Sequence, residues 1–286
     1  MYEDFDFPFE NLIEDEKIAI EIEKTLREAV KRCLEKNKKC ALFFSGGLDS
    51  SVIAKLLNET DVEFTAYTAG TKGSQDPVIA KHVAVELGIK IKTITIKQEE
   101  IPDLVKAVTW ITKSDDPVTI GVGIPLYVAA REASQDGYKI IFSGSGSDEL
   151  FAGYDSHAKA FIKGLKDVHE ECVKRVHGIN KDIARDASIC KHFSLDSFMP
   201  FMDIDLVRLT MNIHPKLKIS GEENKIILRK IAGDIGLPKE AYERKKKAAQ
   251  YGSGVSKTLK AVSKKYGYDN VREYLKEQLA NVYKTK

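Results

Sequence analysis

The sequence predicts an α/β protein, in which a doubly wound parallel sheet is followed by a mostly helical C-terminal half. In residues 39–142, short apolar runs alternate with segments of helical periodicity, a pattern typical of parallel strands joined by helices. Beyond Tyr154 the strand-like runs fade and helical patterns dominate. We therefore expect three regions: an N-terminal helix packed on the core (residues 1–38), the α/β region (39–155) and a helical region (156–286).

The first half divides into an irregular start, one long helix, and four expected strands that are separated by helices. Pro8 argues against helix in residues 4–11, and the apolar stripe that follows predicts an amphipathic helix over residues 14–38. Residues 115–123, with the turn signal Asp116-Pro117, are expected to form a loop. The expected strands are 41–44, 62–69, 89–96 and 138–142, and the expected helices are 48–58, 75–87, 101–112 and 125–135.

The second half is expected to consist of helices packed on the sheet. No internal repeat or low-complexity linker interrupts it. Helical periodicity marks residues 158–174, 179–190, 206–212, 226–232, 256–266 and 270–282.

Composition limits the classes of protein that this chain can belong to. Its 286 residues, 43% of them hydrophobic, can build a substantial core. The net charge of +2 gives no electrostatic footprint for nucleic acid, and no apolar run approaches the length of a membrane span. The four cysteines form no CxxC pair. We expect a reduced, cytoplasmic enzyme without a nucleic-acid or membrane partner.

The first candidate site is the polar loop after the first strand, where Phe44 is followed by SGGLDSS. A tight glycine turn (Gly46, Gly47) that opens a helix lets backbone N–H groups face a phosphate, and the hydroxyls of Ser45 and Ser50 can add donors. Asp49 would repel a bare phosphate, so it suggests a bridging Mg²⁺. An ordinary strand-to-helix turn is the alternative, which the ordered set of polar residues disfavours.

This heptapeptide resembles the signature of the N-type ATP pyrophosphatases, the PP-loop superfamily. The resemblance implies an adenine nucleotide alpha hydrolase-like fold and cleavage of ATP between its α and β phosphates. The segment differs from the Walker P-loop because no lysine follows the glycines directly.

The second candidate site is the loop after the fourth strand, FSGSGSDELFAGY from Phe142 to Tyr154. Its small residues allow a ligand to approach closely, and Asp148 is a candidate second Mg²⁺ ligand opposite Asp49. The alternative is that Asp148 and Glu149 simply favour a helix N-terminus. Ligands of such sheets bind outside the carboxyl ends of the strands, where both loops are expected.

The second loop makes the resemblance more specific, because it is similar to a signature of the synthetase domain of asparagine synthetase. Further segments resemble the same family in the same order, and together they cover roughly residues 14–260. They are Asp186 to Ser188 (DAS), Pro200 to Asp203 (PFMD), Lys225 to Arg229 (KIILR) and Arg244 to Gly254 (RKKKAAQYGSG).

The resemblance implies a role for each matching position. ATP would bind in residues 39–155, and residues 156–286 would complete the active site. Ser45, Gly46, Gly47, Asp49 and Ser50 would hold the phosphates, and Asp49 and Asp148 the Mg²⁺. Gly70 would border the adenine, Gly144 would approach the nucleotide by its backbone, Lys159 would reach the pyrophosphate, and Lys246 would be the catalytic lysine. A solvated basic run is the alternative for Lys246 and its neighbouring lysines.

The implied reaction is adenylation of a carboxylate, aspartate by default, with release of pyrophosphate and transfer of an amine. Only 44 residues precede Ser45, so we expect no glutaminase domain, and ammonia would be free or come from a separate glutaminase subunit. Ser145 stands where the family usually has Glu, and Gly121, Gly123 and Phe198 also depart from it. A PP-loop enzyme acting on another acceptor such as tRNA, and a non-catalytic ATP-binding homologue, are the alternatives.

Overall fold

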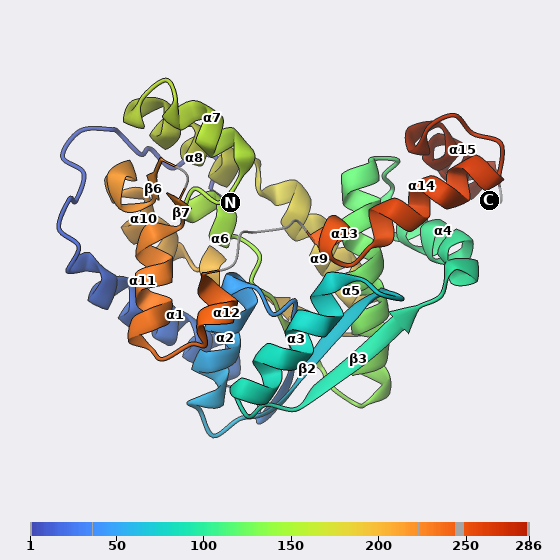
Figure 1. The fold of residues 1–286 in the computed structure, drawn as a ribbon, viewed down its shortest axis with the longest axis horizontal. Coiled ribbons are helices and arrows are strands. Elements are labelled where there is room, and N and C mark those ends of the chain that lie inside the picture. The colour runs from blue at the N-terminus through green and yellow to red at the C-terminus, as the bar shows by residue number, and fades with distance from the viewer. Residues whose placement is uncertain (1, 36, 222, 244–248, 285–286) are drawn as a thin grey trace.

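The computed structural model describes residues 2–35, 37–221, 223–243 and 249–284. Its centre is a parallel five-stranded sheet in the order β3–β2–β1–β4–β5. Figure 1 shows two of these strands, β2 and β3, side by side. The fold class predicted from the sequence is therefore confirmed. The strands are β1 (Lys39–Phe43), β2 (Glu63–Thr71), β3 (Ile91–Ile96), β4 (Ile140–Phe142) and β5 (Asp196–Phe198).

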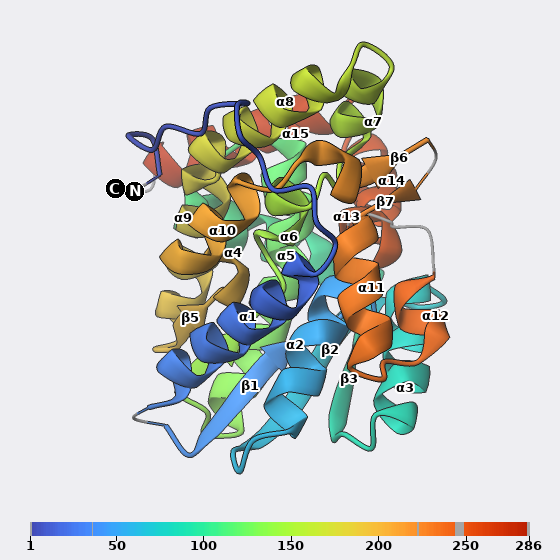
Figure 2. The same cartoon turned by 90° about the vertical axis from the view of Figure 1, so that its left-hand side faces the viewer.

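Each face of the sheet packs against its own apolar core, because side chains alternate along the strands. In β1, Cys40 and Leu42 belong to one core and Ala41 to the other. Figure 2 shows three helices of the first core, α1, α2 and α11, in front of the sheet. The elements of this core are α1 (Ile18–Leu34), α2 (Leu48–Asn58), α3 (Gln75–Glu86), α6 (Ser147–Leu150), α7 (Asp155–Phe161), α8 (Leu165–Gly178), α10 (Ile204–Met211), α11 (Ile226–Asp234) and α12 (Lys239–Tyr242).

The second core lies under helices from both halves of the chain. They are α4 (Ile101–Thr112), α5 (Pro117–Gln135), α9 (Asn180–His192), α14 (Val255–Lys265) and α15 (Val271–Lys284). The short α13 (Ala249–Gly252) precedes α14, and a small antiparallel pair, β6 (Ile219–Ser220) and β7 (Glu223–Asn224), precedes α11. The division of the chain into three regions remains a prediction.

The expected loop at residues 115–123 is wrong. Helix α5 begins at Pro117, and the side chain of Asp116 caps it by accepting the backbone N–H of Thr119 at 2.8 Å. An Asp-Pro pair is a turn signal, but it is also an N-cap followed by proline at the first helical position. The helix continues through Pro125, although proline removes one backbone hydrogen bond.

Other differences concern the ends of helices and short strands. The expected helix 14–38 is shorter, Ile18–Leu34. Just before its start the side chain of Asp15 accepts the N–H of Lys17. The expected helix 158–174 is two helices, separated at Gly164, whose φ of +155° favours glycine. Strand β5 was missed, since three residues are too few to show a pattern.

The strand order reverses between β1 and β4, which are neighbours although α2 to α5 separate them in sequence. Where the strand order of a doubly wound sheet reverses, a crevice forms at the carboxyl ends of the two strands. Such proteins bind their ligands there. The loops that leave β1 and β4 are the two polar loops singled out in the sequence. In the described part of the chain, no helix is long and apolar enough to cross a membrane.

Candidate active site

The loop after β1 is held by its own hydroxyl groups. The backbone N–H of Ser45 donates to Oγ of Ser50 at 3.3 Å, and the two hydroxyl oxygens lie 3.2 Å apart. Ser50 in turn donates to the carbonyl oxygen of Gly47 at 3.2 Å. Gly47 is the N-cap of α2 and provides no side-chain cap, so the N–H groups of the first turn are left for another acceptor. An anion suits such a helix start.

Glycine is needed where the loop touches its neighbours. A Cβ atom on Gly46, whose φ is +70°, would lie 2.7 Å from the backbone of Ala80 in α3. A Cβ atom on Gly144, in the loop after β4, would lie 2.9 Å from Cβ of Asp49 and from the backbone nitrogen of Ser50. The two loops therefore pack backbone to backbone at the sheet edge, as the sequence predicted.

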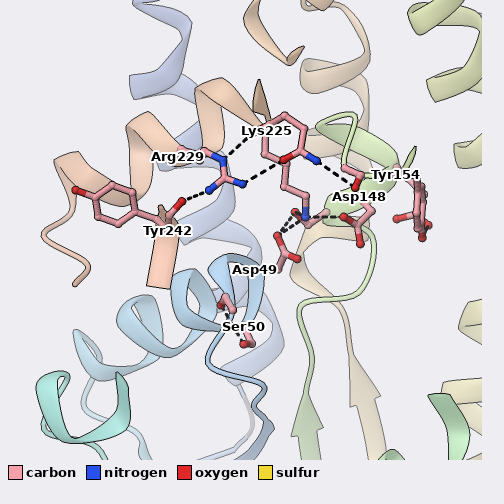
Figure 3. Close-up of polar contacts among 12 residues, drawn as sticks. Asp49, Ser50, Asp148, Tyr154, Lys225, Arg229 and Tyr242 are labelled. Carbon is pink, nitrogen blue, oxygen red and sulfur yellow. Dashed lines mark hydrogen bonds and ion pairs between the residues drawn. The ribbon is translucent and has the colours of Figure 1, made fainter. Parts of the chain in front are cut away.

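Asp49 and Asp148 share one cation. The ammonium of Lys225 lies 2.6 Å from Oδ1 of Asp49 and 2.7 Å from Oδ1 of Asp148 (Figure 3). Ser147 Oγ donates to the same oxygen of Asp49 at 2.6 Å and lies 3.3 Å from the ammonium, which donates to it. The side chain of Lys225 is 2% exposed, while those of Asp49 and Asp148 are 22% and 17% exposed. The ammonium thus lies on the buried side of both carboxylates.

The backbone around Lys225 is fixed from several sides. Lys225 has a left-handed conformation with φ of +56°, and its N–H donates to the carbonyl oxygen of Phe151 at 3.2 Å. Arg229 donates to the backbone oxygen and side-chain oxygen of Asn224, at 2.8 and 3.1 Å. It also donates to the backbone oxygen of Tyr242 (Figure 3). A left-handed lysine persists only where its surroundings hold it.

Electrostatics keep Lys225 charged. Burial alone would lower the pKa of its ammonium, but the carboxylates of Asp148 and Asp49 outweigh burial and raise the pKa above its ordinary value. Two carboxylates and one ammonium leave this cluster with a net charge of −1.

The cluster fits Mg²⁺ in its residue types and in its placement. The ammonium shows that the two carboxylates can share a single cation. Mg²⁺ is usually held by one or two carboxylates together with substrate phosphates. Within the described residues no group of three or more His, Cys, Asp or Glu side chains could hold a metal, so the remaining ligands would have to come from phosphate and water.

A second polar cluster, formed with residues of α9, borders the loop after β4. The hydroxyl of Ser145 donates to Oδ2 of Asp186 at 3.1 Å, and Nε of Arg185 donates to the other oxygen at 2.7 Å. Burial raises the pKa of Asp186, although Arg185 opposes the shift. A Cβ atom on Gly123 would lie 2.8 Å from Val108, so close packing of α5 against α4 explains that departure from the family pattern.

The end of this loop carries a buried acid. Burial, with the charge of Asp148, raises the pKa of Glu149 to about 7, and the hydroxyl of Tyr154 donates to its carboxyl group at 2.6 Å. The guanidinium of Arg175 lies 5.0 Å above the ring of Tyr154. This contact supports the loop from the side of α8.

Of the remaining predicted residues, Gly70 and Lys159 lie in described elements, and Lys246 is not among the described residues. A Cβ atom on Gly70, near the end of β2, would lie 2.5 Å from Oγ of Ser74 and 3.0 Å from the backbone oxygen of Ser253. Lys159 is exposed on α7 and makes no hydrogen bond or ion pair with another described residue. Lys246 lies outside the described residues. The roles assigned to these residues remain predictions.

Sequence reasoning missed Lys225, Ser147 and Asp186 as site residues. Lys225 opens the KIILR segment and Asp186 belongs to the DAS segment, so both motifs were seen without a role for the residue. Only the folded chain brings Lys225 to Asp49, 176 residues away in sequence.

Comparison with known proteins agrees with these motifs. The asparagine synthase family model matches residues 21–171 and 160–282. A protein of Methanocaldococcus jannaschii that carries the name of a glutamine-hydrolyzing asparagine synthetase is 32% identical over 88% of this chain and 52% of its own length. Asparagine synthetase B of Escherichia coli is 29% identical over 85% of this chain and 47% of its own length.

A plant relative gives the same result. Asparagine synthetase 1 of Arabidopsis thaliana is 27% identical over 92% of this chain and 47% of its own length. The chain thus spans about half the length of the curated relatives it matches. The family model covers most of the chain and includes both polar loops and the segment of Lys225. The chain belongs to the asparagine synthase family.

Proposed function

We propose that this chain is an ATP-dependent, AMP-forming amide ligase. It would adenylate a carboxylate, with aspartate as the default, and then transfer an amine to it. The observation that carries this proposal is the sharing of one cation by Asp49 and Asp148 at the carboxyl ends of β1 and β4. Two carboxylates converge there beside the uncapped start of α2, an arrangement suited to a triphosphate with its metal.

The nucleotide half of the site is built to bind and orient phosphates. The first-turn N–H groups of α2 and the hydroxyls of Ser45 and Ser50 would hold phosphate oxygens. Asp49 and Asp148 would hold Mg²⁺, which when bound neutralises charge on the phosphates. Lys246 would donate to the α phosphate as its negative charge grows in the transition state, where a positioned cation lowers the barrier.

The proposed reaction has two steps. A carboxylate oxygen of the acceptor attacks the α phosphorus, the bond between this phosphorus and the bridging oxygen breaks, and pyrophosphate leaves. A neutral amine then attacks the carbonyl carbon, AMP leaves with the adenylate oxygen, and the nitrogen loses a proton. Ser145 cannot take up that proton unaided, but its hydroxyl is already directed at Asp186, so its lone pairs can accept a hydrogen bond from the amine.

The amine source is part of the proposal. Ammonia would be free or would be delivered by a separate glutaminase subunit. The names of these relatives describe glutamine hydrolysis, but this chain matches only about half of their length.

Product analysis tests the proposal. The chain is incubated with ATP, Mg²⁺, ammonium and a panel of amino acids with side-chain carboxylates, and the nucleotides are separated by chromatography. We expect acid-dependent formation of AMP and pyrophosphate, together with the amide. Release of ADP and phosphate would contradict the proposal. Saturable ATP binding with no product from any acid would support the non-catalytic alternative.

A further inference from the structure

The contact between Lys225 and the two candidate metal ligands affects whether a metal ion can bind before the nucleotide. Mg²⁺ gives up its water reluctantly and needs several oxygen ligands in exchange. At this site one oxygen of Asp49 and one of Asp148 are already in contact with an ammonium. Free Mg²⁺ would therefore meet a cluster whose net charge is −1 instead of −2, because the ammonium of Lys225 offsets one of the two carboxylates.

The carboxylate of Asp49 is oriented for a ligand on its other side. Its Oδ1 accepts from both Lys225 and Ser147. Its Oδ2 has no partner within the described part of the chain. Because the ammonium is almost fully buried and the carboxylate is partly exposed, the remaining oxygen is left for a cation arriving from the open side. Hydrogen-bonded partners that fix a ligating carboxylate in this way are usual around metal sites.

The ammonium has little freedom to move away. A Cβ atom on Gly153 would lie 2.3 Å from Cε of Lys225 and 2.0 Å from Oδ1 of Asp148, so the backbone at this glycine closes in on the pair. The backbone of Lys225 is itself held by Phe151 and, through Asn224, by Arg229. The positive charge is therefore a permanent part of the site.

We propose that Lys225 is a positioning residue whose charge keeps free divalent metal from Asp49 and Asp148, so that the metal binds there only together with a nucleoside triphosphate. The phosphates supply the missing negative charge and the missing oxygen ligands. This inference rests on the proposed function for the identity of the nucleotide, but it concerns metal binding and not turnover.

The test measures binding of Mn²⁺, which replaces Mg²⁺ and is visible by electron paramagnetic resonance. Free Mn²⁺ is titrated with the wild-type chain, with and without α,β-methylene-ATP, which cannot be cleaved between its α and β phosphates. Lys225→Met keeps most of the side-chain length and removes the charge. Lys225→Arg keeps the charge. Lys218→Met is the matched control, because Lys218 is also fully buried but contacts neither carboxylate.

We expect the wild-type chain to bind Mn²⁺ weakly alone and tightly with the analogue. Lys225→Met should bind Mn²⁺ alone roughly tenfold or more tightly than wild type, because one unit of positive charge close to the ion is gone. Lys225→Arg and Lys218→Met should bind like wild type. Far-UV circular dichroism checks that each variant is folded.

Two results would overturn the inference. One is tight Mn²⁺ binding by the wild-type chain without nucleotide, and this result decides the matter even if Lys225→Met does not fold. The other is a folded Lys225→Met that binds Mn²⁺ no more tightly than wild type. If Mn²⁺ binding follows the expected pattern and no AMP is ever formed, the proposed reaction fails while the inference about Lys225 stands.

Discussion

Gly153 lies against Lys225 so closely that a Cβ atom at this glycine would be 2.3 Å from Cε of the lysine. It would also be 2.0 Å from the Asp148 oxygen that the lysine contacts. The absence of a side chain at one position therefore decides the geometry of the charged cluster.

Gly153→Ala should displace Lys225 or Asp148 and reduce stability. Overpacking a tight interior of this kind costs about 1–3 kcal/mol in the free energy of unfolding. The control is Gly178→Ala at the end of α8, where a Cβ atom meets nothing within 4 Å and alanine should be neutral or slightly stabilising. Urea unfolding measures both variants, and equal stability of the two would show that the cluster tolerates the extra atom.

Asp49→Asn and Asp148→Asn should each reduce AMP formation by about two orders of magnitude or more, since each removes a charged ligand of the metal and phosphate site. The control is Asp136→Asn. Asp136 also pairs with a lysine and a hydroxyl, Lys92 at 2.8 Å and Tyr67 at 2.7 Å, but it follows α5 at the opposite edge of the sheet. Initial rates at saturating ATP give the comparison. Normal rates in both site variants would refute the assigned roles.

Lys246→Ala should lower kcat by roughly 10²–10³ while the KM for ATP changes little, because the lysine is proposed to act on charge that develops in the transition state. Lys257→Ala, at an exposed lysine in α14, should leave the rate unchanged. A loss confined to KM would point instead to a role in binding the substrate.

Burial of His157 is expected to make the free energy of unfolding depend on pH. Burial lowers the pKa of its imidazole from 6.5 to about 4, while Glu171 and Arg175 act in opposite directions. The folded chain thus holds a neutral imidazole, whereas the unfolded chain gains a proton below pH 6.5. This contribution to stability is complete above pH 6.5 and is lost as the pH falls toward 4.

The variant His157→Asn removes this titration and keeps an acceptor for the N–H of Tyr154, which donates to Nδ1 of His157 at 3.1 Å. Between pH 6.5 and 4, the wild-type free energy of unfolding should fall relative to that of the variant by up to about 3 kcal/mol. Urea unfolding at several pH values measures the difference. Parallel curves for the two chains would mean that His157 is not neutral in the folded protein.

Local patterns were enough to predict the sheet and both polar loops. Glycine, serine and aspartate follow two apolar runs, and the rule that parallel strands end at one edge places those loops together. The start of α5 was missed because Asp116-Pro117 serves equally as a turn and as a capped helix start. Strand β5 was missed because its pairing with β4, and not its own sequence, makes it a strand.

The charged cluster required the folded chain. A lysine at the start of a helical pattern normally reaches solvent, and nothing near Lys225 in the sequence shows that it is buried between two aspartates. The contact between Ser145 and Asp186 could not be predicted from the sequence either. The two residues are 41 positions apart and meet only through the packing of α9 beside the loop after β4.

Exchange of labelled pyrophosphate into ATP tests the central claim most directly, because it reports reversal of the first proposed step and needs no amine. With Mg²⁺, ATP and the correct carboxylate, the wild-type chain should incorporate label into ATP, and Asp49→Asn should not. Product formation with ADP and phosphate, in place of exchange and AMP, would contradict the account.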